Sequence, residues 1–213
     1  MILSKAHYFQ LFQVDPAALE RLVREGLRSG GSYCDLYFEY TRYGSLLLRD
    51  GAVTSGGLHQ DFGVGIRVLS GEKTGYAYSE SADPADWMAC ARAAAQIADR
   101  PVEVNPYGTR RPSRGEPNPA ADRYPAARSW FDASLEAYLP FLQTLEQEVR
   151  SRETRVVKVM ANLAFQESDY LMYNSQQELK WDTRPLGSVS LTVVFRQGER
   201  TDHDERPRVR SQS

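Results

Sequence analysis

The amino-acid sequence predicts an α+β fold in which antiparallel sheets pack against about three helices. Two stretches, residues 33–79 and 155–195, alternate apolar and polar side chains with a period of two, which is typical of strands with one solvated face. Three other stretches repeat apolar residues every three or four positions, as amphipathic helices do. Short turn sequences connect the strands, and such connections favour antiparallel pairing.

The first helix is predicted to begin at Asp15 and Pro16. An aspartate side chain can accept hydrogen bonds from free backbone amides, and proline suits the first helical position. Gly30 and Gly31 are expected to end the helix. One apolar face connects these signals and consists of Leu19, Leu22, Val23 and Leu27.

The first β region, residues 33–79, is predicted to contain about five strands in meander order. Asp50 and Gly51 are predicted to form a hairpin turn between residues 45–49 and 52–55, because glycine tolerates positive φ. Residues 70–72 predict a second turn. A second helix should begin at Asp83 and Pro84, with one face formed by Trp87, Ala91, Ala94 and Ala98.

Residues 101–128 hold six of the 11 prolines and show neither period, which indicates a linker or a long surface loop. A third helix follows around residues 135–149, and Pro140 should kink it or move its start.

The charged end of this third helix, residues 146–153, is interpreted as a solvated face. The second β region, residues 155–195, has predicted turns at residues 168–169 and 174–175.

Composition narrows the classes of protein to which the chain can belong. Its 213 residues fit one large or two small domains, and 26 Lys and Arg against 28 Asp and Glu lack the basic excess of a nucleic-acid binder. The sequence shows no apolar run of about 20 residues for a membrane helix and no secretory signal. Two cysteines, Cys34 and Cys90, suit a reducing cytoplasm and are interpreted as small buried apolar residues.

A search for sites of chemistry finds no catalytic or metal-binding residues, and substrate-binding residues stay unknown. His7, His59 and His203 are too scattered for a metal-binding helix, and neighbouring residues at 202–205 cannot surround one ion. Gly63 and Gly65 begin a dinucleotide fingerprint that lacks its third glycine and its helix. Glycines that let a strand twist or approach another backbone explain them better. No Gly-x-Ser-x-Gly motif is present.

One segment nevertheless resembles a known family. Residues 61–79, DFGVGIRVLSGEKTGYAYS, are similar to the hallmark of the N-terminal half of TldD in the TldD/PmbA family, once named modulators of DNA gyrase. Three further segments agree in order and spacing: residues 35–39 (DLYFE), 47–53 (LLRDGAV) and 182–194 (DTRPLGSVSLTVV). The resemblance covers about residues 12–200, and the Gly-Glu-Lys-Thr-Gly turn favours TldD over its partner PmbA, also called TldE.

The resemblance implies a zinc metallopeptidase that works as a TldD–TldE heterodimer on unfolded or short peptides. In that family a His-Glu-x-x-x-His helix and a later cysteine hold zinc, and the glutamate acts as general base. All of these residues belong to the C-terminal half of the family. We therefore expect no catalytic residue, metal ligand or cofactor within this chain.

The resemblance also sets an expected domain organisation. Residues 1–200 should form a TldD/PmbA N-terminal domain, residues 201–213 a divergent charged tail, and the C-terminal metallopeptidase domain should be absent. A frameshift, a premature stop, a split gene or a genuinely short protein would each produce this pattern. The chain alone is then expected to be inactive and to bind a TldE-like subunit or associate with itself.

Two alternatives stay open. The chain could be a stand-alone module that binds peptides or a partner, with no chemistry of its own, by adding a strand to its sheet. It could also be a distinct enzyme that uses polar side chains of the sheet, in which case Arg67 or Arg184 would be essential. We favour structural roles for both arginines, as members of ion pairs or as loop anchors.

Overall fold

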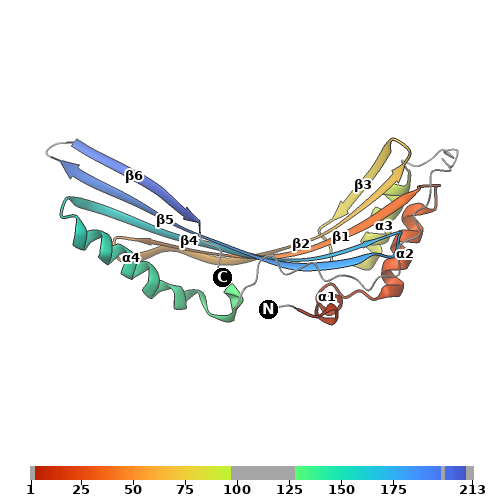
Figure 1. Cartoon of the computed structure of the whole chain (residues 1–213), viewed down its shortest axis with the longest axis horizontal. Coiled ribbons are helices and arrows are strands. Elements are labelled where there is room, and N and C mark those ends of the chain that lie inside the picture. Colours follow the sequence, from red (N-terminus) through yellow and green to blue (C-terminus); the bar gives the residue numbers. More distant parts are fainter. Residues whose placement is uncertain (1–2, 97–127, 198–199, 210–213) are drawn as a thin grey trace.

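A computed structural model describes residues 3–96, 128–197 and 200–209, and in this part of the chain one antiparallel sheet has the order β3-β2-β1-β4-β5-β6. The sheet is strongly curved, and the helices lie on its convex side while the concave side stays open (Figure 1). The α+β class with antiparallel strands is therefore confirmed. The elements are α1 (Lys5–Leu11), α2 (Pro16–Leu27), β1 (Tyr33–Arg49), β2 (Ala52–Ser70), β3 (Lys73–Ser79), α3 (Pro84–Ala95), η2 (Trp130–Asp132), η3 (Leu135–Tyr138), α4 (Leu139–Arg152), β4 (Val156–Asn174), β5 (Leu179–Gln197) and β6 (Arg200–Val209).

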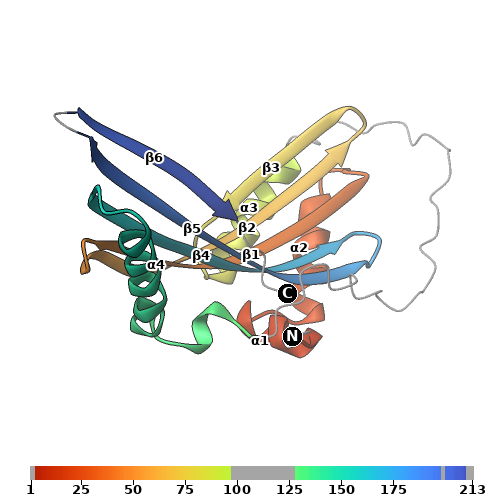
Figure 2. The same ribbon diagram turned by 60° about the vertical axis from the view of Figure 1, so that its left-hand side comes forward.

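Four long strands form the centre of the sheet, and the two short strands β3 and β6 lie at its two edges. β3 pairs only with residues 64–70 of β2, and β6 pairs only with residues 188–197 of β5. The two short strands diverge from each other above the long ones (Figure 2). On their outer sides, residues 52–63 of β2 and 179–187 of β5 have no partner strand within the described part of the chain.

The number of strands predicted for residues 33–79 was wrong. The structure has three strands there, because β1 and β2 run unbroken for 17 and 19 residues. The predicted turn at residues 168–169 was also wrong, since both residues lie inside β4 opposite Thr41 and Tyr40. The turns at Asp50, at Gly71 and at residues 174–175 are confirmed.

Pairing between β1 and β4 joins the two β regions into one sheet. The register runs from Asp35 opposite Asn174 to Arg49 opposite Met160. β6 was not predicted, because the charged residues 200–209 show no apolar period. Backbone hydrogen bonds form a ladder irrespective of side-chain type, so β6 can pair with β5 without that pattern.

The helix starts follow the sequence signals closely. Asp15 and Asp83 accept hydrogen bonds from backbone amides at the starts of α2 and α3, each of which has proline in its first turn. Pro140 lies in the first turn of α4 and so moves the helix start to Leu139, as expected. α1 was not predicted from the sequence. Ala98 and residues 101–128 fall outside the described residues.

None of the described helices combines the length and apolar character needed to span a bilayer.

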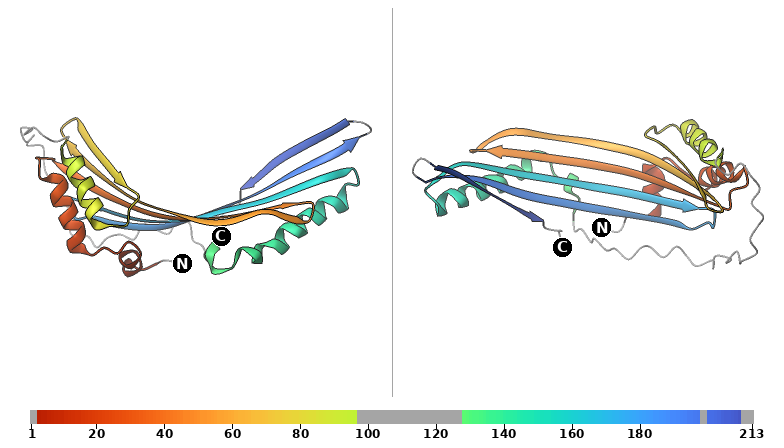
Figure 3. Two further views of the ribbon diagram at one scale, coloured as in Figure 1. Left: turned by 180° about the vertical axis from the view of Figure 1, so that it is seen from behind. Right: turned by 90° about the horizontal axis from the view of Figure 1, so that it is seen from above.

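The core consists of two separate clusters beneath the convex side of the sheet. The larger lies under α1, α2 and α3 and includes Phe38, Ile66 and Trp87, and the smaller lies under η2, η3 and α4 and includes Leu48, Leu142 and Leu163. Views from behind and from above show these helices at opposite ends of the sheet (Figure 3). The middle of the sheet therefore lies between two helical caps.

The charged end of α4 is not simply a solvated face, which corrects the sequence interpretation. The Glu146 side chain is 8% exposed and accepts a 2.7 Å hydrogen bond from the Gly51 backbone amide. Arg150 donates 2.9 Å to Glu146 and also contacts Asp50. α4 is thus bonded to the β1–β2 hairpin, which holds the far end of both strands.

Candidate functional site

The concave face of the sheet carries the side chains that the helices leave uncovered. Even-numbered residues of β1, such as Leu36, Phe38 and Leu48, are buried under the helices. Successive side chains of a strand point to opposite faces, so the odd-numbered residues of β1 face the concave side. Two adjoining hollows lie on this face and form the candidate binding site.

The first, which we call the acidic hollow, has a volume of about 320 Å³. Three strands build it, because β1, β2 and β3 lie side by side there. Its lining includes three carboxylates, Glu39, Asp61 and Glu80. Four tyrosines complete most of its wall: Tyr37, Tyr43, Tyr76 and Tyr78.

Gly65 on β2 makes room for Tyr76 of β3. A Cβ atom at Gly65 would lie 2.8 Å from the Tyr76 hydroxyl, so the Tyr76 side chain crosses directly over this glycine. The close contact at position 65 is therefore with a side chain and not with another backbone, whereas a Cβ atom at Gly63 would meet nothing within 4 Å. The rings of Tyr76 and Tyr78 lie 6.5 Å apart and nearly parallel.

Glu39 is held by two side-chain hydrogen bonds within the hollow. Its carboxylate accepts hydrogen bonds from the hydroxyls of Tyr37, at 3.2 Å, and Thr41, at 3.0 Å. Burial, followed by the negative charge of Glu39, raises the pKa of the Tyr37 hydroxyl, which therefore stays a proton donor. Thr41 also lies 2.8 Å from the Ser168 hydroxyl on β4, which fixes this part of the wall.

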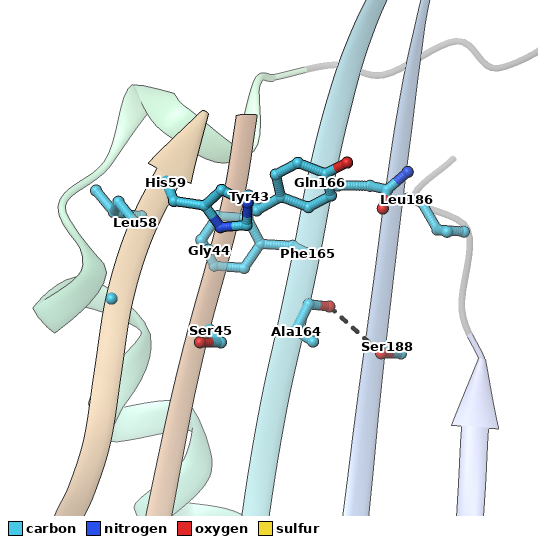
Figure 4. A pocket seen from close by; sticks show the side chains of 11 residues that line it. Tyr43, Gly44, Ser45, Leu58, His59, Ala164, Phe165, Gln166, Leu186 and Ser188 are labelled. Atoms are coloured by element: carbon cyan, nitrogen blue, oxygen red, sulfur yellow. Dashed lines mark hydrogen bonds between the residues drawn. The ribbon is translucent and has the colours of Figure 1, made fainter. Parts of the chain in front are cut away.

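The second hollow, of about 400 Å³, lies farther along the same face (Figure 4). The rings of His59 and Tyr43 stack at one side of it with centroids 4.4 Å apart, and Leu186 and Ser188 approach from β5 on the other. His59 Nε2 lies 3.6 Å from Asp61 Oδ2. Both of these side chains are 65% exposed, so this contact contributes little to stability.

Arg67 and Arg184 form ion pairs, as expected from the sequence. Arg67 binds Asp35, its cross-strand neighbour, through two guanidinium nitrogens. Arg184 donates 2.9 Å to Asp182 and lies 4.8 Å from the centre of the Tyr170 ring. Both arginines are thus engaged at the concave face without contributing to either hollow.

A buried polar group of residues in the middle of the convex side was missed by sequence reasoning. Arg42 pairs with Glu167, which also accepts 3.0 Å from the Ser129 hydroxyl. Next to them Thr183 donates to Asp169 and bonds Tyr8 of α1 at 2.6 Å. Burial raises the pKa of Asp169 although the Thr183 hydroxyl bond opposes this.

Neither cysteine is activated. Cys34 is fully buried, and desolvation raises the pKa of its thiol to about 12, while burial also raises the pKa of Cys90. Within the described residues no group of three or more His, Cys, Asp or Glu side chains could hold a metal ion. His7 lies in α1 and His59 in β2, so these two described histidines do not fit a zinc site. The backbone of residues 202–205 belongs to β6, and their side chains lie outside the description.

Comparison with known proteins gives the same family that the sequence resembles. Residues 34–98 match the model of the PmbA/TldA metallopeptidase domain 1. A metalloprotease TldD homolog of Haemophilus influenzae is 34% identical over 163 residues, which cover 76% of this chain and 33% of that protein. A second homolog, from Buchnera aphidicola, is 28% identical over 195 residues, or 91% of this chain and 37% of that protein.

Solved structures show the same fold at low sequence identity. A modulator of DNA gyrase from Bacteroides thetaiotaomicron superimposes with a TM-score of 0.68 and 11% identity, over 90% of this chain and 44% of that one. TldE from Thermococcus kodakarensis gives 0.65 and 16% identity, over 91% and 43%. The chain spans about a third of the length of the curated relatives that it matches. By its sequence segments, its matched domain and its fold, this chain belongs to the TldD/PmbA family.

Proposed function

We propose that this chain is the N-terminal, non-metal-binding portion of a TldD-like metallopeptidase that acts on unfolded or short peptides together with a TldE-like subunit. The observation that carries this proposal is its 34% identity to a metalloprotease TldD homolog, one third of whose length it spans. Zinc would belong to the full-length family members. The two free cysteines suit the cytoplasm as the place of action.

By itself, the 213-residue chain is proposed not to cleave peptides. Its sequence contains no His-Glu-x-x-x-His segment, and the three histidines stand at positions 7, 59 and 203. The contribution of the chain would instead be to bind and orient. Binding of an extended peptide or a partner strand without chemistry is the second candidate function, and the open edge of β2 favours it.

The open edge of β2, residues 52–63, is suited to pairing with another strand. It contains no proline, lysine or arginine, whereas the corresponding open part of β5, residues 179–187, contains Lys180, Arg184 and Pro185. Proline and charged side chains on edge strands discourage pairing with other chains. An added strand would gain backbone hydrogen bonds on β2, and this mode of binding tolerates many sequences.

The absence of catalysis is tested by incubating the purified chain with zinc and an unfolded casein substrate. We expect no cleavage above the level without protein, either alone or in the presence of a chelator. Stoichiometric zinc together with chelator-sensitive cleavage would contradict the proposal. Recovery of a TldE-like subunit in a defined complex would support the partner role, and failure of the two purified proteins to associate would oppose it.

Strand addition is tested with two proline substitutions, Gly57→Pro and Leu58→Pro. Successive backbone amides of a strand point to opposite edges, so one substitution removes an amide directed at β1 and the other an amide directed at the open edge. We expect the variant that keeps wild-type stability to lose binding of a labelled casein peptide in fluorescence anisotropy. Unchanged binding by that variant would exclude the open edge as the site.

A further inference from the structure

We propose that the acidic hollow binds a primary ammonium group carried by a peptide, at the end of a lysine side chain or at a free amino terminus. The inference deepens the proposed function, since it rests on the concave sheet being a peptide-binding surface. Charge, hydrogen bonding and the aromatic wall of the hollow each support it.

The charge of the hollow is negative and is not neutralised by the arginines of the same face. Glu39, Asp61 and Glu80 line it, and its lining includes no lysine or arginine. Arg67 is bonded to Asp35 and Arg184 to Asp182, so neither of these cations pairs with the carboxylates of the hollow. Asp61 lies 3.6 Å from the exposed His59 imidazole, and a ligand with a positive charge would supply the counter-charge that Glu39 lacks.

Glu39 shows the clearest need for such a partner. Its carboxylate is partly buried and accepts hydrogen bonds from the neutral hydroxyls of Tyr37 and Thr41. Among the described residues no cation forms an ion pair with it. Partial burial strengthens electrostatic attraction, and an ammonium donor makes stronger hydrogen bonds to a carboxylate than a neutral hydroxyl does.

The tyrosines provide the second half of the recognition. Tyr76 and Tyr78 are 62% and 67% exposed, so their rings are accessible from the concave side. A cation over the face of an aromatic ring is attracted by the electron density of that face, and the alkyl part of the ligand can pack on the same rings. A neutral or acidic group of equal size lacks the attraction to the ring face and keeps only the packing of its alkyl part.

A small probe tests the hollow independently of peptide binding. Nuclear magnetic resonance of the tyrosine ring signals is followed while n-butylammonium is added, with n-butanol as the uncharged control. We expect n-butylammonium to shift the signals of Tyr37, Tyr76 and Tyr78 at concentrations about tenfold lower than n-butanol, and added salt to reduce this preference. Equal effects of the two probes would overturn the inference.

Substitutions locate the binding to the carboxylates. Glu39→Gln and the exposed Asp61→Asn should each weaken n-butylammonium binding about threefold or more, in proportion to the lost attraction. Glu72→Gln, in the turn between β2 and β3, is the matched control and should leave it unchanged. Asp61→Asn keeps the test decisive if Glu39→Gln fails to fold. The assignment to these carboxylates would be contradicted if Asp61→Asn and Glu72→Gln bound n-butylammonium equally well while Glu39→Gln either bound it as the wild type does or failed to fold.

Peptides then distinguish the two sources of the ammonium group. Capped peptides that contain either lysine or norleucine are compared with an uncapped peptide that contains norleucine. If the capped lysine peptide binds most tightly, the hollow binds the lysine side chain. If the uncapped norleucine peptide binds most tightly, the hollow binds the free amino terminus. If the capped norleucine peptide binds as tightly as the other two peptides, the inference fails while peptide binding stands. If n-butylammonium binds but no peptide does, the hollow is supported and the peptide-binding function fails.

Discussion

At the scale of single residues, Gly44 shows how closely the sheet and its helical caps fit together. A Cβ atom there would lie 2.2 Å from the Phe165 ring, which packs against Trp130, Phe131 and Tyr138. We expect Gly44→Ala to lower the free energy of unfolding by about 1–3 kcal/mol, because that ring has little room to move. Urea unfolding measures the loss.

Gly57→Ala is the matched control for Gly44→Ala. Gly57 also lies in a long strand, but an added Cβ meets nothing within 4 Å. The alanine there should leave stability unchanged or raise it by up to about 1 kcal/mol. Equal effects of the two alanines would show that the close approach at Gly44 is not restrictive.

Asp169 makes stability depend on pH in an unusual direction. Burial raises its pKa in the folded protein above the ordinary value of 3.8, so the folded state takes up this proton more readily than the unfolded state. The ionised carboxylate therefore costs stability at neutral pH, and this cost disappears as the pH falls through the raised pKa toward 3.8.

Asp169→Asn removes the titration while keeping an oxygen that can accept from Thr183. We expect the free energy of unfolding of the variant to exceed that of the wild type most at pH 7, and this difference to shrink as the pH is lowered. Urea unfolding at several pH values checks this, with Asp61→Asn, at a side chain 65% exposed on β2, as the control. A difference that stayed constant with pH would refute the assignment.

At the scale of elements, a clamp between α4 and the β1–β2 hairpin replaces the solvated face expected from the charged sequence. Glu146→Ala would leave the Gly51 amide without its carboxylate acceptor and Arg150 with Asp50 as its remaining partner. We expect a loss of about 1–3 kcal/mol in the free energy of unfolding. Glu148→Ala, at a side chain 59% exposed, should cost less than about 0.5 kcal/mol.

Local signals predicted element ends better than element lengths. Asp15, Asp83 and Pro140 act within one helical turn, so their effect was visible in the sequence. The unbroken course of β4 through Ser168 and Asp169 was not, because these residues gain their partners Thr41 and Thr183 from other strands. Polar residues that suggest a turn can thus occupy a strand when distant groups satisfy them.

At the scale of the whole molecule, the open edge of β2 and the exposed side chains of Val53 and Leu58 favour association. We expect light scattering to show the apparent mass rising with protein concentration. Leu58→Lys should reduce this rise, because a charge on an edge strand opposes pairing. The control is Phe141→Lys, at a side chain on α4 that is 48% exposed, and it should leave this rise of the apparent mass unchanged. A sharp monomer peak at high concentration would contradict the prediction.

The sequence by itself determined the α+β class, the helix starts, the hairpin at Asp50 and Gly51 and the family, because these depend on local periodicity, caps and short motifs. Only the tertiary structure decided that the two β regions form one curved sheet, that polar residues fill the space between two separate cores, and that carboxylates and tyrosines of β1, β2 and β3 meet in one hollow. The physical reason is that strand register and sheet curvature arise from pairing between distant segments, as between β1 and β4.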